Sequence, residues 1–254
     1  MMSKSLLLIA ACAAAGMSGF VGAAERPTPL PDQKGVVADA LRPCPSSLER
    51  FLPADYYFCD AARDYWSGRD GATRESLKDA AAWASKPAQY ALGIMYYNGD
   101  HAEKNRALGL AWLGLAVERH NPEYEAAFKD AYAHVSRDEL AQANVYWNDL
   151  KKKYSDDVAA PRAERRFNRA YDELSYAINF GGSVFIDGVG GLPMTDGAVI
   201  ADEAMGTSGF NIGRTLQSRK ASVLAGWKEN VYVGDAQLVP VGQVVQRSPS
   251  PTAQ

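Results

Sequence analysis

The side chains that usually perform acid–base or nucleophilic chemistry are few here, and none forms a known catalytic motif. No Ser-x-x-Lys, Lys-Thr-Gly or Gly-x-Ser-x-Gly occurs, so no serine is paired with a base at a recognised spacing. The histidines, His101, His120 and His134, have no second ligand at the i, i+4 spacing of a helical metal site. We expect them at surface or helix-capping positions, and Asp156-Asp157 and Asp202-Glu203 on solvated faces. The sequence therefore predicts no catalytic site, no metal site and no cofactor.

A glycine run, Gly188-Val189-Gly190-Gly191, follows a β-like stretch and raises the question of a phosphate-binding loop. Such a loop needs a helix N-terminus directly after it and the complete G-x-G-x-x-G spacing. Here Leu192-Pro193 follows, and the last glycine is missing. We expect an ordinary loop.

The cysteines offer one candidate covalent bond. Cys44 and Cys59 lie fifteen residues apart and remain as a pair if an N-terminal leader containing Cys12 is removed. An even number of cysteines in an exported chain predicts a disulfide, worth roughly 3 kcal/mol for so short a loop. Two buried free thiols are the alternative. A metal site is not expected, because no histidine lies near either cysteine.

The N-terminal residues have the composition of a secretory signal peptide. Lys4 precedes an apolar stretch that ends in small residues, and cleavage after Ala23 or Ala24 would leave a chain beginning near Glu25. We therefore predict export to the periplasm, with residues 1–24 removed. Ile9-Ala10-Ala11-Cys12 also resembles a lipobox, so lipid anchoring through Cys12 is an alternative. The net charge of −3, without a basic face, argues against a nucleic-acid partner.

Two amphipathic helices are predicted in the middle of the chain. Ala88, Ala91, Leu92 and Met95 form one apolar stripe, and the stretch 106–120 repeats that spacing around Trp112. The turn Asn98-Gly99-Asp100-His101 separates them, with Gly99 as the expected left-handed cap. Gly93 interrupts its helix at a cost of roughly 0.5–1 kcal/mol, so we expect it where two helices approach closely.

The order of features in this hairpin occurs more than once. Tyr65-Trp66-Ser67-Gly68 corresponds to Tyr96-Tyr97-Asn98-Gly99, and Pro87 to Pro122, a repeat distance of about 31–35 residues. A third, more degenerate unit follows, in which Ser136 and Glu139 form a capping box. Periods of this length are typical of helical solenoids.

The repeat resembles the Sel-one-like repeat family, a relative of the tetratricopeptide repeats. The positions that carry the resemblance are Ala88, Leu92, Gly93, Met95, Tyr96, Gly99, Ala111, Trp112 and Ala116. The match is close over 88–121 and looser over 59–86 and 122–154. It departs from the family at Gly99-Asp100-His101-Ala102, where Gly-x-Gly-Val is usual. The resemblance implies a short right-handed α-solenoid and a role as an adaptor or regulator in the bacterial envelope.

The chain after the repeats matches no family that we recognise. The linker 155–161 is expected to precede one helix over 162–180, with Phe167, Tyr171, Leu174 and Ile178 as its apolar stripe. Two β-like stretches, 183–188 and 230–235, suggest paired strands, with a helix over 210–227 between them. The domains expected are a signal peptide (1–24), an extended segment (25–54), the repeats (55–154), a small α+β module (155–245) and a disordered tail (246–254).

These observations predict a mainly α protein that is not an enzyme. We expect it to bind an unidentified protein or peptide partner, through exposed residues such as Arg74, Tyr97 and Arg106. The alternative is a module that binds a cell-wall fragment or another small ligand through the C-terminal segment. An envelope hydrolase is the least supported hypothesis. The sequence predicts no transmembrane span in the mature chain and leaves the oligomeric state open.

Overall fold

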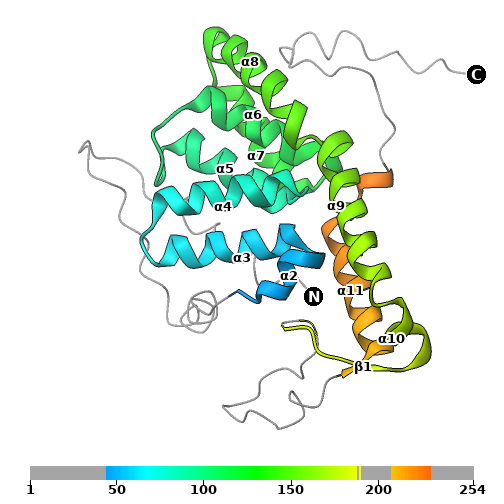
Figure 1. The fold of residues 1–254 in the computed structure, drawn as a ribbon. Helices are drawn as coiled ribbons and strands as arrows, with labels where there is room; N and C mark the ends of the chain where they lie inside the picture. Colours follow the sequence, from blue (N-terminus) through cyan, green and yellow to red (C-terminus); the bar gives the residue numbers. More distant parts are fainter. Residues whose placement is uncertain (1–43, 188, 190–206, 230–254) are drawn as a thin grey trace, which may run out of the picture.

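The computed structural model describes residues 44–187, 189 and 207–229, which are mainly helical (Figure 1). The helices are α2 (Ser46–Phe51), α3 (Pro53–Trp66), α4 (Asp70–Ala82), α5 (Lys86–Asn98), α6 (Arg106–Ala116), α7 (Pro122–His134), α8 (Arg137–Tyr154), α9 (Asp156–Asp172), α10 (Ser175–Phe180) and α11 (Gly209–Val223). Two short 3₁₀ turns, η4 (Val117–Arg119) and η6 (Trp227–Glu229), and two strands, β1 (Ser183–Val184) and β2 (Thr207–Ser208), complete the list.

Helices α3 to α8 form the larger part of the molecule, in which neighbouring helices of the chain pack as hairpins. Helix α3 packs against α4 and α5 against α6, while α8 lies chiefly against α6. Figure 1 shows these helices as layers on one side, with α9 and α11 side by side on the other. Trp112, Leu92 and Leu115 are buried in the core shared by α4, α5 and α6.

Local signals set the ends of α5 and of its neighbours. Ser85 caps α5 by accepting a hydrogen bond from the Ala88 N–H, and Gly99 ends the helix with φ +85°. Asn105 caps α6 in the same way as Ser85 caps α5. The predicted capping box of Ser136 and Glu139 is confirmed at the start of α8.

Glycines allow α5 and α6 to approach closely. A Cβ added at Gly93 would lie 2.7 Å from Leu113 Cγ, and one at Gly109 would lie 2.5 Å from the Tyr97 backbone nitrogen. Gly93 is therefore the close contact that the sequence predicts. Of the remaining repeat-motif residues, Ala88, Leu92, Met95, Ala111, Trp112 and Ala116 are buried, and Tyr96 packs against the same core.

Helix α9 begins six residues earlier than predicted. The segment 155–161, expected to be a linker, is largely the first turns of α9, and Pro161 lies inside the helix. Glu118, distant in sequence, accepts a hydrogen bond from the backbone N–H of Asp156 (2.9 Å) and so caps this end. Pro161 has no N–H to donate to the carbonyl of Asp157, four residues earlier. Asp157 is exposed in the first turn of α9, so the missing hydrogen bond lies at the exposed end of the helix. A cap from elsewhere in the chain explains the difference.

The rest of the C-terminal part also differs in detail from the prediction. The helix expected over 162–180 is divided into α9 and α10, with the break at Glu173 and Leu174. Strand β1 pairs antiparallel with β2. The segment 230–235, predicted to pair with 183–188, lies outside the described residues. The predicted helix between the β-like stretches is confirmed as α11. Its Gly209 and Gly213 lie against Ala177 and Ile178 of α10, a contact that requires the chain to turn after α9.

The N-terminal described residues are helical rather than extended. Helix α2 falls in the segment 25–54, and Cys44 and Cys59 form the predicted disulfide, with their Cα atoms 6.0 Å apart. Leu48 and Phe51 of this short helix are buried against Phe167. Local propensity would not hold six residues in a helix. The disulfide and this apolar contact account for α2.

Candidate functional site

The three residues predicted to bind a partner are half-buried and engaged within the chain. Arg106 donates to the Tyr97 hydroxyl (3.2 Å), stacks over its ring at 5.2 Å and forms an ion pair with Glu139 (3.3 Å). Tyr97 donates to the backbone carbonyl of Ala131 (3.2 Å). Arg74 lies apart from this pair. The expectation that they are exposed is wrong, because each ties one helix to a neighbouring turn.

Arg74 instead holds the turn after α5. Its guanidinium donates to the His101 carbonyl oxygen. The His101 side chain is buried, not at the surface as predicted, with Nδ1 3.3 Å from Asp70 Oδ1 and its ring 5.2 Å from that of Tyr65. The turn, which departs from the family pattern, is thus fixed to α3 and α4. The other two histidines fit the prediction: both side chains are exposed, and both stand at helix ends.

The most concentrated group of polar side chains is a buried charge cluster of Lys86, Glu118, Arg119 and Asp156. Lys86 Nζ lies 2.5 Å from Glu118 Oε2 and 3.2 Å from Asp156 Oδ1. Arg119 binds both oxygens of Asp156, at 2.8 and 2.7 Å. Side-chain exposure is 9% or less for all but Glu118, which is 22% exposed. The sequence does not reveal this cluster, because its members come from α5, η4 and α9, and the expectation that Asp156 lies on a solvated face is wrong.

The two carboxyl groups of the cluster respond differently to burial. Burial raises the pKa of Glu118, and the nearby charge of Asp156 adds to the rise against the opposing effect of Lys86. Burial acts on Asp156 too, but hydrogen bonds from Arg119 and the charge of Lys86 outweigh it and hold its pKa below the usual value. The two-fold contact with Arg119 explains the difference.

The charge cluster has the properties of a structural link rather than a reactive site. Lys86 Nζ also donates to Leu115 O (2.8 Å) and Gln89 Oε1 (3.0 Å), which completes its three donors. Arg119 also donates to the Val223 carbonyl at the end of α11 (2.5 Å). A nucleophile or general acid needs a free atom directed at a substrate. The hydrogen bonds here are directed at the fold itself.

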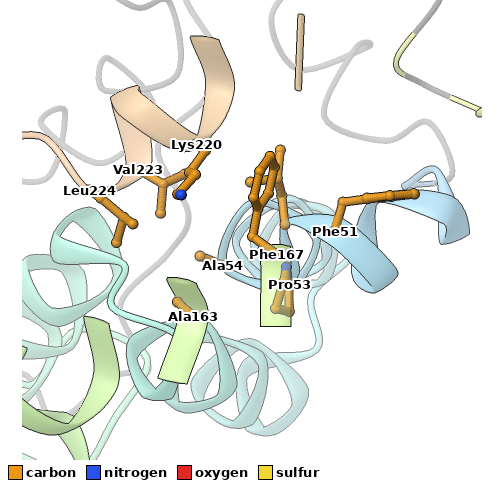
Figure 2. Close-up of a pocket in the computed structure, with 9 residues that line it drawn as sticks. Phe51, Pro53, Ala54, Ala163, Phe167, Lys220, Val223 and Leu224 are labelled. Atoms are coloured by element: carbon orange, nitrogen blue, oxygen red, sulfur yellow. The ribbon is translucent and has the colours of Figure 1, made fainter. Parts of the chain in front are cut away.

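A small apolar cavity lies where α2, α3, α9 and α11 meet. Figure 2 shows Phe167 in the middle of this junction, with Lys220 and Val223 of α11 and the following Leu224 on one side and Phe51 on the other. Its volume is about 10 Å³, enough for about one water molecule. Lys220 Nζ, the charged group of the lining, donates to Asn168 Oδ1 (3.0 Å). The cavity therefore cannot hold a sugar or a peptide.

Next to this junction, Asp55 stands in the first turn of α3. Burial raises its pKa to about 6, and the charge of Arg219 on α11 only partly opposes the rise. Carboxyl groups that titrate near neutral pH occur in active sites, where they lie in a cleft together with partner groups. The cavity beside Asp55 is too small for that role. We interpret the shift as a cost of packing α3 against α11.

Large aromatic side chains are exposed at one end of the molecule. We call Tyr176, Phe180, Phe185 and Phe210 the aromatic surface; their exposed fractions are between 61% and 76%. They come from α10, the residue after β1 and the start of α11, which pack together at the lower end of Figure 1. The rings of Tyr176 and Phe180 are 5.0 Å apart. Exposed apolar groups of this size are typical of interaction sites.

Within 44–187 and 207–229, no three His, Cys, Asp or Glu side chains are grouped so that they could hold a metal ion. In the same part of the chain, none of the helices combines the length and the apolar character that crossing a bilayer requires. Of the predicted glycine loop, Gly188, Gly190 and Gly191 lie outside the described residues.

Comparison with known proteins does not place the chain in a family. No family model, no curated protein and no solved structure matches it. The functional assignment therefore depends on the residues themselves.

Proposed function

We propose that this chain is a non-enzymatic Sel-one-like repeat protein that binds a protein partner in the bacterial cell envelope. In this proposal α3–α4 and α5–α6 are two repeats of a short right-handed α-solenoid, and α7 and α8, which each pack on α6, form a third, more degenerate unit. The positions of Gly93, Gly99 and Trp112, at the contact and turn of one hairpin, support it. Helices α9 to α11 and the β1–β2 pair form a small module on the last repeat.

The aromatic surface is the observation that carries the binding function. Removing a Phe or Tyr side chain from water is favourable by about 2 kcal/mol, and the fold leaves four such side chains largely in water. Aromatic residues with arginine dominate the binding energy of protein interfaces. Arg214 lies over the Phe210 ring at 5.8 Å and adds that residue type to the surface. A partner with an apolar face of its own would bury these rings.

Export to the periplasm is part of the proposal. The signal-peptide composition of residues 1–24 supports export, although those residues lie outside the described part of the chain. A disulfide is weakly compatible with it, since disulfides persist in oxidising compartments. Lipid anchoring through Cys12 stays the alternative to a soluble form.

Site-specific cross-linking in the protein's own cells tests the function. Benzoylphenylalanine replaces Phe180 in one strain and Val145 in another; Val145 is an exposed apolar residue of α8 and serves as the matched control. We expect a discrete adduct with one protein from position 180 and none from position 145. Adding Tyr176→Ser and Phe210→Ser should remove the adduct. The same adducts from both positions, or none from position 180, would refute the proposal.

The two other functions considered for this chain gain less support. A module for cell-wall fragments needs a cleft, and the junction cavity holds about one water. A hydrolase needs a reactive group with a free atom, and the buried charge cluster directs its groups at the fold.

A further inference from the structure

Helix α9 carries four arginines that the fold does not neutralise. Within the described part of the chain, none of Arg162, Arg165, Arg166 and Arg169, which we call the arginine surface, forms an ion pair with a carboxylate. Arg162 and Arg166 donate only to backbone carbonyls, such as those of Ala82 and Arg50. Other arginines, for example Arg50 with Glu173, are paired.

Three carboxylates near this surface are engaged elsewhere, and within the described residues the other two of α9, Asp157 and Asp172, form no ion pair with these arginines. Asp156 binds Lys86 and Arg119, and Glu164 binds Lys220 and Lys228. Glu173, just after the helix, binds Arg50. The four positive charges of the arginine surface are thus not paired with a carboxylate, and they lie within about 10 Å along the helix axis.

The spacing of these arginines opposes helix stability rather than supporting it. Arg162 and Arg166, like Arg165 and Arg169, are separated by four residues, which places like charges next to each other on the helix. Burial lowers the pKa of Arg162, and the charge of Arg165 adds to this effect. Arg165 and Arg169 are exposed. The four arginines therefore do not stabilise the helix through one another.

A tryptophan ring holds the guanidinium groups of two of these four arginines in place. The Cζ atoms of Arg162 and Arg166 lie 5.4 and 5.6 Å from the centroid of the half-buried Trp83 ring at the end of α4. Stacking on the ring and hydrogen bonds to carbonyls hold both guanidinium planes in place before any ligand arrives. The fold uses Nε and Nη2 of both side chains, so within the described residues Nη1 of each is the nitrogen that can donate to a carboxylate oxygen of a ligand.

We propose that the arginine surface binds an acidic peptide segment, rich in Asp and Glu, of the protein partner. The proposal rests on the proposed function, because it names the chemistry of that partner, but it concerns a second surface. An extended anionic surface such as a membrane would meet the whole protein, whose net charge is −3. A peptide meets only the local positive charge, and arginine clusters are the usual recognition device for acidic segments.

The first experiment measures fluorescence anisotropy of a labelled synthetic peptide of Glu and Gly with the folded protein at low ionic strength. A peptide of Gln and Gly is the neutral control. We expect the acidic peptide to bind, with an affinity that falls as salt is added, and the neutral one not to bind. In Arg165→Glu/Arg169→Glu we expect affinity to fall roughly tenfold or more.

The matched control is Arg137→Glu/Lys152→Glu, which reverses two exposed cationic residues outside α9 and outside the aromatic surface. It should bind the acidic peptide within about twofold of the native protein. Both variants should keep the native circular dichroism spectrum and melting temperature, because all four residues are exposed.

Three outcomes would overturn the proposal. One is no binding of the acidic peptide, and another is an equal loss in both variants. The third is that the protein does not bind the peptide but binds phosphatidylglycerol vesicles or a single-stranded oligonucleotide, and that Arg165→Glu/Arg169→Glu loses this binding. None of them affects the cross-link from position 180, so failure here is distinguishable from failure of the proposed function.

Discussion

Replacing Gly109 by Ala tests whether the close approach of α5 and α6 holds helices α3 to α8 together. The added Cβ would lie 2.5 Å from the Tyr97 nitrogen and 2.7 Å from its Cα, both backbone atoms that no rotamer change can move. Ordinary contact begins at 3.4 Å, so the two helices must separate by about 1 Å. The separation weakens a core that contains Leu110, Leu113 and Trp112, each 2% exposed or less.

The expected cost follows from two opposing effects. Overpacking and lost contacts cost about 4 kcal/mol, and the better helix propensity of alanine returns up to about 1 kcal/mol. A net loss of about 3 kcal/mol lowers the melting temperature by about 6–12 °C in a chain of this size. Calorimetry or thermal denaturation followed by circular dichroism measures it.

Two other glycines provide a graded control. At Gly71, in α4, an added Cβ has no neighbour within 4 Å, so Gly71→Ala should be neutral or stabilise by up to about 1 kcal/mol. At Gly93 the nearest atoms belong to the side chain of Leu113, which can move, so Gly93→Ala should cost about 1–2 kcal/mol. A Gly109→Ala protein that melts like Gly71→Ala would refute the reasoning.

Three further predictions concern charge, pH and the disulfide. Lys86→Met should lower the free energy of unfolding in urea by about 3 kcal/mol, because it leaves Glu118 buried without its ammonium partner. The control Lys129→Met, at an exposed ion pair, should lower it by less than about 0.5 kcal/mol. Equal losses in the two variants would argue against a stabilising role for the buried charge cluster. The pKa of Asp55 is about 6 when folded and 3.8 ordinarily, so the folded state holds this proton more tightly and stability falls as pH rises from about 4 to 6. Asp55→Asn should therefore stabilise the protein by about 1–2 kcal/mol at about pH 7.5 and should not stabilise it at about pH 4. An equal stabilisation at both pH values would contradict the burial of the Asp55 charge. Reducing the Cys44–Cys59 disulfide should cost about 3 kcal/mol, measured by melting with and without a reductant; an unchanged melting temperature would show that α2 holds without it.

The parts of the fold that the sequence predicts well are those fixed by neighbouring residues. Apolar spacing identified α5 and α6, a glycine marked the end of α5, and Ser136 with Glu139 marked the start of α8. Each signal acts within a few residues of the feature that it sets. The disulfide could be predicted because it depends on a count and on the compartment.

Features that depend on distant residues could not be predicted in this way. The start of α9 depends on Glu118, so the local pattern around Pro161 indicated a linker where there is a helix. Arg106 and Tyr97 look exposed by type, and only the packing of α6 beside α7 and α8 shows that they are engaged. The basic face of α9 escaped notice because Glu164 lies among its arginines, and only the structure shows Glu164 paired with Lys220 and Lys228.

The same distant contacts join helices α3 to α8 to the C-terminal helices across the domain boundary predicted after Tyr154, which stays a prediction. Asp156, at the start of α9, is held by Lys86 from α5 and Arg119 from η4, and Arg119 also reaches the end of α11. Phe167 of α9 is covered by Phe51 of α2. A fragment beginning at 155 would expose Phe167 and leave Asp156 without either cation. Breaking such a buried ion pair costs several kcal/mol. The surfaces on α9 and α10 that we propose as binding sites therefore depend on helices α2 to α8 for their shape, and binding there has to be measured with the whole chain.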